Sequence, residues 1–483
     1  MIRTLLPLLA LLLVGPATAQ TLELDDCRIS AGSGMPSMKA RCGMLTRPLD
    51  PSGQVEGDIE LRVAVVPALN LTPETDPVVP IAGGPGQGSV QFYTAYSSAF
   101  EPVRRNRDIL LVDQRGTGDS ATMDCEFDDD LVEGQYSTEL TIKYTQQCLD
   151  ELPHDARFFT TSVAVQDLDA VREALGYPAL NLYGVSYGSR VAQHYARQYP
   201  QHTRTITIDV VVPPQKSLGP EIATESQAAV DNILGRCLDD TACSEHFPNI
   251  DQTFDDVLAR LTDAPVDVVA PHPSTGRPEA FAFGQNEFAV AIRLLAYSPR
   301  SIALMPLLIH EAGEGHYVPL ASQYLMTMIS LTDALSLGMH NSVMCSEDVP
   351  FFDPETIDYD ALAASYMGPL QLDALEAICS IWPAGPIDDG FKEPLATDLP
   401  VLLLSGDVDP ITPPSWANLA MVDMDNARHL IGKDQGHGQI AVGCMPEIVA
   451  DFIETADPQS LDTDCMERSF VMPFFVDFSG PAP

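Results

Sequence analysis

Basic residues are scarce in this chain. Lys and Arg number 26 against 68 Asp and Glu, which gives the 483 residues a formal net charge of −42. A protein with such an excess of negative charge repels the phosphates of nucleic acids and of anionic membranes. We therefore expect no nucleic acid partner, and we interpret the acidity first as a source of solubility.

Long hydrophobic runs are lacking beyond the N-terminus. The run at 5–14 follows Arg3 and precedes the small residues at 17–19, which is the pattern of a secretory signal peptide. It is shorter than the roughly twenty residues that a membrane-spanning helix needs. The sequence therefore predicts a signal peptide at 1–19 and a mature chain, from Gln20, that is exported to the periplasm or beyond without membrane insertion. A lipid anchor is the alternative, and no cysteine follows residue 19 closely enough to favour it.

Zinc-type motifs are lacking too, because there is no CxxC pair and no Cys/His cluster at zinc spacing. We expect no metal or organic cofactor. The ten cysteines form an even set, and an exported chain favours disulfides over free thiols. Their spacing suggests local pairs, although connectivity is open from sequence alone: Cys27 with Cys42, Cys125 with Cys148, Cys237 with Cys243, Cys345 with Cys379, and Cys444 with Cys465.

Short β-branched runs alternate with helical patterns in two separate stretches of the chain. This alternation predicts an α/β fold with a mostly parallel sheet covered by helices on both faces. Helices are expected at 163–175 and 187–199. The expected strands are 59–66, 78–82, 109–112, 180–185, 205–212, 401–404 and 428–431.

The alternation stops between residues 213 and 395. This segment carries mainly helical patterns, at 232–238, 254–261, 288–295, 302–312 and 324–337. We predict a helical cap inserted between a first core part at 20–212 and a second core part at 396–483.

The strongest chemical motif is G-V-S-Y-G at 184–188, a G-x-S-x-G between an expected strand and an expected helix. In that context the serine sits on a sharp turn at a helix N-terminus, which makes Ser186 a candidate nucleophile. The structural alternative is an ordinary glycine-bounded helix cap.

A serine nucleophile needs a base and an orienting acid from later in the chain, in the order Ser, Asp, His. His437 lies between two glycines after the strand at 428–431, and Asp409 lies just past the strand at 401–404. Asp407 is the competing acid, and Pro410 after Asp409 favours the latter. His429 falls inside a strand, where packing or a satisfied structural hydrogen bond is the simpler role.

An acyl-transfer site also needs amide donors for the oxyanion. The residue after the nucleophile supplies one, which is the Tyr187 amide. The glycine-rich loop at 82–88 follows an early strand, and Gly84 is our candidate for the second. A flexible turn or a phosphate loop is the alternative, but no G-K-[ST] follows.

The motifs at 83–86 (G-G-P-G), 113–120 (D-Q-R-G-T-G-D-S) and 184–188 resemble the prolyl iminopeptidase and tripeptidyl aminopeptidase family of α/β-hydrolases. Ala82 stands where that family often has histidine, so no role of that histidine is carried over. Asp113 and Arg115 are expected to brace the oxyanion loop.

The later half resembles the secreted tripeptidyl-aminopeptidase-like subgroup, through C-S-E at 345–347 and C-S-I-W-P at 379–383. The resemblance implies removal of residues from a free peptide N-terminus. A carboxylate in the cap would bind the substrate's ammonium group best. Glu347 is the candidate, with Asp348 behind it, and a solvated surface acid is the alternative.

The expected function is thus an exported serine aminopeptidase that acts on a peptide or small acyl substrate through an acyl-enzyme. A carboxylesterase with the same triad is one alternative, and a catalytically silent hydrolase-fold binding protein is another. The sequence leaves the oligomeric state and the number of residues released open.

Overall fold

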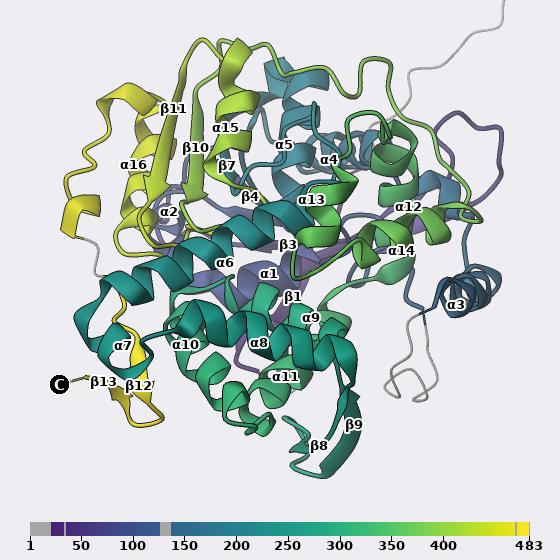
Figure 1. Ribbon diagram of the computed structural model, residues 1–483. Coiled ribbons are helices and arrows are strands. Elements are labelled where there is room, and N and C mark those ends of the chain that lie inside the picture. Colours follow the sequence, from purple (N-terminus) through teal and green to yellow (C-terminus); the bar gives the residue numbers. More distant parts are fainter. Residues whose placement is uncertain (1–20, 33–34, 126–136, 469–470, 483) are drawn as a thin grey trace, which may run out of the picture.

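A nine-stranded sheet forms the centre of the computed structural model, which describes residues 21–32, 35–125, 137–468 and 471–482 (Figure 1). The strands follow one another across the sheet in the order β1 (Asp25–Ser30), β2 (Ser37–Pro48), β3 (Asp58–Val66), β5 (Ile109–Val112), β4 (Val78–Ile81), β6 (Leu180–Val185), β7 (Thr203–Asp209), β10 (Val401–Gly406) and β11 (Ala427–Gly432). Neighbours from β5 to β11 are parallel, and β1 to β3 add an antiparallel edge. The prediction of a mostly parallel sheet is confirmed. The predicted signal peptide lies outside the described residues.

The central strands are hydrophobic because both of their faces are covered. Every residue of β4, β5, β6 and β10 is buried, so these strands are mainly apolar and do not alternate polar with apolar residues. In contrast, β1 and β2 alternate exposed and less exposed residues and carry many polar side chains. These two edge strands were not predicted.

Helices cover both faces of the sheet. One face carries α4 (Thr161–Leu175), α5 (Tyr187–Gln198) and α15 (Pro414–Ala420), and the other carries α1 (Ser89–Tyr96), α2 (Glu101–Arg104) and α16 (Met445–Thr455). The two layers match the predicted arrangement.

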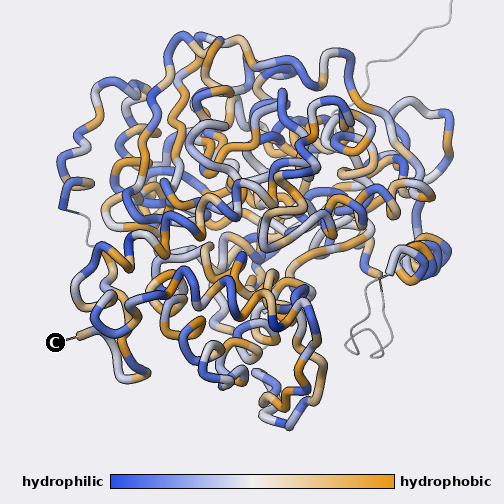
Figure 2. Tube along the Cα trace, in the orientation of Figure 1, coloured by the Kyte–Doolittle hydropathy of each residue, from blue (hydrophilic) through white to orange (hydrophobic). Residues whose placement is uncertain are grey.

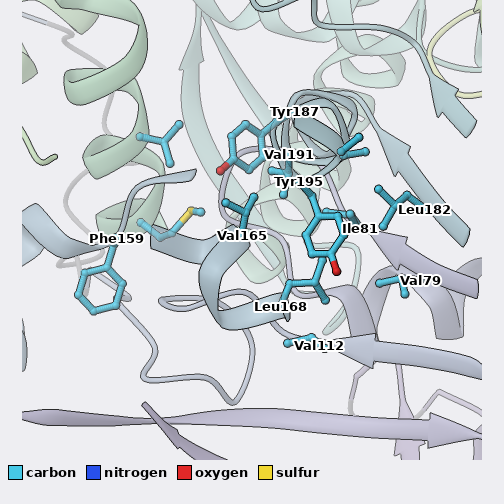
Figure 3. Packing of buried hydrophobic residues seen from close by; sticks show 14 of the residues in the cluster. Val79, Ile81, Val112, Phe159, Val165, Leu168, Leu182, Tyr187, Val191 and Tyr195 are labelled. Carbon is cyan, nitrogen blue, oxygen red and sulfur yellow. The ribbon is translucent and has the colours of Figure 1, made fainter. Parts of the chain in front are cut away.

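Helices α4 and α5 pack against each other on one face of the sheet, and Figure 3 shows side chains of both helices near those of the strands. Val191 and Tyr195 of α5 lie in one buried cluster with Val165 and Leu168 of α4 and with Leu182 of β6. Burying such side chains stabilises the folded state by about 1.5–3 kcal/mol each. This packing fixes the start of α5, where the G-x-S-x-G motif lies.

We call residues 213–395 the cap segment. Its helices are α6 (Ile222–Asp239), α7 (Thr241–His246), α8 (Ile250–Asp263), α9 (Gln285–Leu295), α10 (Pro299–Gly313), α11 (Val318–Ala334), α12 (Leu337–Val343), α13 (Tyr359–Ala364) and α14 (Leu370–Cys379). In Figure 1 the elements from α6 to α11 gather below the sheet, whereas α12, α13 and α14 lie beside the core. The cap segment contributes most of one apolar cluster, which Val408 and Phe474 complete from outside it. The segment also holds an antiparallel pair, β8 (Val266–Pro271) and β9 (Pro278–Phe283), which the helical prediction missed. The division into core and cap domains stays a prediction.

The remaining elements lie at the periphery. Helix α3 (Thr138–Glu151) packs against α14, and the short strands β12 (Phe475–Asp477) and β13 (Gly480–Pro481) pair near the C-terminus, with β12 against α10. In Figure 2 hydrophilic blue dominates many outer loops, while orange runs along the strands. Among the described residues, no helix is both long and apolar enough to cross a membrane.

The ten cysteines form five disulfides, and they are the five pairs that the spacing suggested. Three of them close segments around the core, at Cys27–Cys42, Cys125–Cys148 and Cys444–Cys465. The other two, Cys237–Cys243 and Cys345–Cys379, lie within the cap segment.

Candidate active site

Ser186 sits on a sharp turn between β6 and α5. Its backbone has φ 54° and ψ −126°, a conformation that L-residues rarely adopt. The flanking glycines make the turn possible, because a Cβ on Gly184 would lie 2.2 Å from the Gly188 carbonyl oxygen, and one on Gly188 equally close to that of Ile81. The strained serine at this strand-to-helix turn has the form of a nucleophile elbow.

Asp409 and His437 meet beyond the ends of β10 and β11. The His437 Nδ1 lies 2.9 Å from each Asp409 carboxylate oxygen, and Asp409 is buried. Burial raises the pKa of Asp409, but His437 and the amides of Ile411 and Thr412 outweigh it and hold that pKa below its ordinary value. Asp409 is thus a carboxylate that orients the imidazole.

The two competing residues lie elsewhere. Asp407 is exposed, and its side chain has no hydrogen bond to His437. His429 lies within β11 and bonds Ser405 and Asn418 through its two ring nitrogens, at 2.9 and 3.0 Å. Burial lowers the pKa of His429 to about 4, which keeps the ring neutral. Its two ring hydrogen bonds give it a structural role.

The glycine-rich loop runs directly beside Ser186. A Cβ on Gly83 would lie 3.0 Å from the Ser186 Cβ, and Gly84 has φ 109°, which excludes a side chain there. Because residues 83 and 84 are glycines, the backbone of this loop lies closer to Ser186 than it could with any other residue type there. The Tyr187 amide lies at the first position of α5, where helix N–H groups are unpaired. Both predicted oxyanion donors are placed around Ser186.

The cap segment contacts this loop from the other side. Ser336 donates its amide to the Gly86 carbonyl at 3.0 Å, and the His340 Nδ1 lies 3.2 Å from the Pro85 carbonyl oxygen. A Cβ on Gly86 would lie 2.7 Å from the Ser336 carbonyl oxygen. The junction between α11 and α12 therefore lies against the oxyanion loop.

A second cap contact reaches the histidine loop. His437 donates its amide to the Tyr297 carbonyl at 2.9 Å, and the two rings pack with centroids 4.8 Å apart. Tyr297 follows α9, so the cap segment borders both the proposed base and the oxyanion loop. Among the described residues, no hydrogen bond joins the Ser186 hydroxyl to His437.

Glu347 lies deep inside the protein, in the π-helical turn Met344–Asp348. Its carboxylate accepts bonds from the Thr161 amide at 2.6 Å and the Thr161 hydroxyl at 2.8 Å, and that hydroxyl also bonds the Tyr187 hydroxyl. Burial raises the pKa of Glu347 to about 7, although Arg190 opposes it. The side chain is neither a solvated surface acid nor open to a ligand in this conformation.

Asp348 has a different environment. Both of its oxygens accept bonds from Arg190 of α5 at 2.8 Å, and the Leu218 amide adds a third. Burial raises its pKa, but Arg190 and Lys392 outweigh burial and lower it. Asp348 is a buried ion-pair partner rather than a second ligand behind Glu347.

The D-Q-R-G motif divides into two structural roles. Asp113 accepts from the Val90 amide at 2.9 Å and so holds the end of the glycine-rich loop. Arg115 does not reach that loop: it pairs with Asp167 of α4 and donates to the Leu49 and Phe158 carbonyls. The expectation that Arg115 braces the oxyanion loop is therefore wrong, because its guanidinium pairs with the buried carboxylate of Asp167 instead.

A buried carboxylate that the sequence analysis missed lies at the end of β7. Asp209 accepts from the Gln439 and Ile440 amides, and its backbone carbonyl accepts from the Ser186 amide. An acid in the buried run at 205–212 was the signal that could have found it, since buried acids require partners. Among the described residues, no group of three or more His, Cys, Asp or Glu is placed to hold a metal ion.

Family comparisons agree with this geometry. The family described as "alpha/beta hydrolase fold" matches residues 76–229, and the family described as "TAP-like protein" matches residues 364–465. The chain is an α/β-hydrolase with a TAP-like region. The first match contains Ser186, and the second contains Asp409 and His437.

The hydrolase resembles named enzymes at modest identity. It is 27% identical to a tripeptidyl aminopeptidase of Streptomyces coelicolor over 216 residues, which is 40% of this chain and 39% of that protein's length. It is 26% identical to the serine protease Hip1 of Mycobacterium tuberculosis over 443 residues, 82% of each chain. The hydrolase belongs to the serine hydrolase class.

Solved structures are more distant. The proline iminopeptidase of Mycobacterium smegmatis matches with a TM-score of 0.38 and 16% identity, covering 86% of this chain and 99% of that one. A likeness at this level adds nothing to the assignment, which comes from the family matches and the sequence relatives.

Proposed function

We propose that this hydrolase is an exported serine peptidase that cleaves peptide bonds near a free N-terminus, with Ser186 as nucleophile, His437 as base and Asp409 as orienting acid. One observation carries the proposal. Buried Asp409 and partly exposed His437, 2.9 Å apart, lie past the ends of β10 and β11, in the same sheet whose strand β6 ends at Ser186. Strand ends of a parallel sheet are where such sites form.

In the proposed reaction, the His437 Nε2 takes the Ser186 proton as the hydroxyl oxygen attacks the scissile carbonyl. The Gly84 and Tyr187 amides receive the oxyanion, and His437 then protonates the leaving amine. Water repeats these steps on the acyl-enzyme. Asp409 bonds Nδ1, so it keeps the proton there and leaves Nε2 free to act as base. The Ser186–His437 bond must form on substrate binding, as is common for sites without substrate.

Peptidase activity is favoured by the relatives, which are named as a tripeptidyl aminopeptidase and a serine protease. Export is favoured by the five disulfides, which persist in oxidising compartments, and by the signal-like sequence at 1–19.

Glu347 stays in the proposal as the acceptor of the substrate's ammonium group. Its hydrogen-bond donors are uncharged and its pKa is raised by burial, so a cation beside it would stabilise its ionised form. This role requires the Thr161 contact to open when substrate binds. Asp348 is left out, because Arg190 already occupies both of its oxygens.

The test compares a tripeptide p-nitroanilide with a free N-terminus against its N-acetylated form. We expect hydrolysis of the free form to be strongly preferred, and Ser186→Ala to abolish both hydrolysis and labelling by a fluorophosphonate probe. Ser330→Ala, at an exposed serine of α11, is the matched control and should change neither. Equal rates on both peptides, or faster cleavage of simple esters, would favour the carboxylesterase alternative. Unchanged labelling of Ser186→Ala would reject the nucleophile.

A second experiment concerns Glu347 alone. Glu347→Gln should raise KM for the free-amine peptide while it leaves hydrolysis of a simple ester largely unaffected. Equal losses on both substrates would remove Glu347 from ammonium binding and leave the rest of the proposal standing.

A further inference from the structure

Asp209 connects the proposed nucleophile to the loop that carries the proposed base. Its strand, β7, lies between β6, which ends at Ser186, and β10, which leads to Asp409. The Asp209 carbonyl accepts from the Ser186 amide at 2.9 Å, while the carboxylate accepts from the Gln439 amide at 2.9 and 3.0 Å. Asp209 is thus hydrogen-bonded both to Ser186 and to the loop that follows His437. The distance between these two segments determines how the proposed base approaches the proposed nucleophile.

The carboxylate is fully occupied and fully buried. Besides Gln439, it accepts from the Ile440 amide at 3.0 Å and from the Tyr183 hydroxyl at 2.6 Å. A buried carboxylate is costly unless several donors satisfy it, and here two consecutive amides of the histidine loop do so. The loop conformation two residues after His437 is therefore tied to this side chain.

The backbone next to Asp209 is strained. Val210 has φ 51°, and a β-branched residue rarely adopts a positive φ. Its amide nevertheless bonds the Leu404 carbonyl of β10 at 2.8 Å. Strain of this kind persists only where surrounding contacts over-determine the conformation, and both Asp209 and Val210 are held by such contacts.

We infer that Asp209 is a positioning residue of the site: it fixes the His437 loop relative to Ser186, so that the hydrogen bond needed for proton transfer can form when substrate binds. The inference rests on the proposed triad. Asp209 touches neither substrate nor reacting atoms. It acts through the Gln439 and Ile440 amides on one side and the Ser186 amide on the other.

Asp209→Asn is the main test, because an amide of the same shape cannot accept all of these donors. A displacement of about 1 Å in such a site lowers the rate roughly 10²-fold. We expect a fall in kcat of that order, with KM of the peptide p-nitroanilide within about twofold of the wild type.

The pH profile provides a readout that a purely structural role would not move. Burial raises the pKa of Asp209 to about 6, and His437 lies near enough for its positive form to interact with the Asp209 carboxylate. Tyr183 and Tyr96 also face it. Replacing it by neutral Asn should move the acid limb of kcat/KM to lower pH.

Tyr183→Phe is the milder companion, because it removes one hydroxyl donor and leaves the carboxylate in place. We expect a several-fold loss of kcat in the same direction, so the inference stays testable if Asp209→Asn does not fold. Asp108→Asn is the matched control. Like Asp209, Asp108 accepts hydrogen bonds from a tyrosine hydroxyl, that of Tyr177, and from a backbone amide, that of Ala68. It precedes β5 and therefore lies at the end of the parallel strands opposite to the proposed site.

The inference is overturned if folded Asp209→Asn and Tyr183→Phe both keep kcat within twofold of the Asp108→Asn control and the acid limb stays in place. Fluorophosphonate labelling of the wild type separates this from failure of the triad. If the wild type is labelled at Ser186 and the kcat of both variants is unchanged, only the role of Asp209 is rejected. If the wild type is not labelled at Ser186, the proposed function is rejected.

Discussion

The core side and the cap side of the proposed site are built in different ways. On the core side, Ser186, Asp409 and His437 each follow a strand of one parallel sheet, so topology alone brings them to one edge. On the cap side, Glu347 and Asp348 lie in a π-helical turn, and their properties depend on partners from other elements.

The two neighbouring acids of the cap side illustrate the difference. Asp348 accepts two hydrogen bonds from the Arg190 guanidinium and has a lowered pKa. Glu347 lies 3.7 Å from the same guanidinium but accepts hydrogen bonds from uncharged Thr161, and its pKa is raised. Strand order predicts where a core residue lies, but only the tertiary partners decide the charge of a cap residue. The following experiments test this contrast.

The largest effect is expected on the core side, from Asp409→Asn. An amide cannot hold the His437 proton on Nδ1, and loss of the correct tautomer lowers kcat roughly 10⁴-fold in serine proteases. Steady-state hydrolysis of the peptide p-nitroanilide measures it. Asp407→Asn, at the exposed neighbouring acid, is the control and should retain wild-type kcat. Similar losses in both variants would contradict the assignment of Asp409.

The next effect is on stability, at the contact between α5 and the cap segment. Arg190→Met leaves Asp348 buried without its countercharge, which destabilises proteins by about 3–5 kcal/mol. Urea unfolding followed by fluorescence gives the change in the free energy of unfolding. A loss below about 1 kcal/mol would mean that Lys392, 3.4 Å from Asp348, neutralises it alone.

A smaller effect separates the two acids by pH. The pKa of Glu347 is about 7 in the folded protein against an ordinary value of 4.5, so the folded state retains a proton that the unfolded chain releases. This group therefore lowers the free energy of unfolding as pH rises from 4.5 to 7. Glu347→Gln should remove that slope, as measured by urea unfolding at pH 5 and pH 7.5.

Asp348→Asn is the matched variant for this comparison. The lowered pKa of Asp348 means that its stabilising contribution is complete above the ordinary value of 3.8 and is lost only as pH falls below it. Asp348→Asn should thus leave the slope between pH 5 and pH 7.5 as in the wild type. Equal slopes in the wild type and Glu347→Gln would contradict the raised pKa.

The smallest effect is expected at an ion pair on the surface. Arg157 bonds Asp155 at 2.6 Å, but its side chain is 48% exposed, and exposed pairs contribute little. Arg157→Ala should leave Tm unchanged within error by scanning calorimetry. A clear fall in Tm would show that geometry outweighs exposure in this pair.

The sequence predicted the core better than the cap. Strands β5 and β6 have the predicted bounds, because buried parallel strands leave apolar runs bounded by turn residues. The hairpin of β8 and β9 was missed inside a segment assigned as helical. Its alternating residues at 266–271 and the S-T-G turn at 274–276 were the available signal.

For the site, chain order and neighbouring residues pointed to Ser186, Asp409 and His437, and the structure brings Asp409 within 2.9 Å of His437. Their catalytic roles stay a prediction. The environment of Glu347 could not be predicted, because Thr161 and Arg190 come from distant parts of the chain. The same holds for His340, because its contact partner Pro85 lies 255 positions away along the chain.

The cap segment borders the core at two loops, through Ser336 at the Gly86 carbonyl and through Tyr297 at the His437 amide. For a protein engineer, this means that residues 213–395 are a poor candidate for exchange as a module. An insertion from another protein that only joined the same two strands would leave the glycine-rich loop and the His437 loop without their contacts to Ser336 and Tyr297. Substrate range in this scaffold is better altered by single replacements inside the existing insertion.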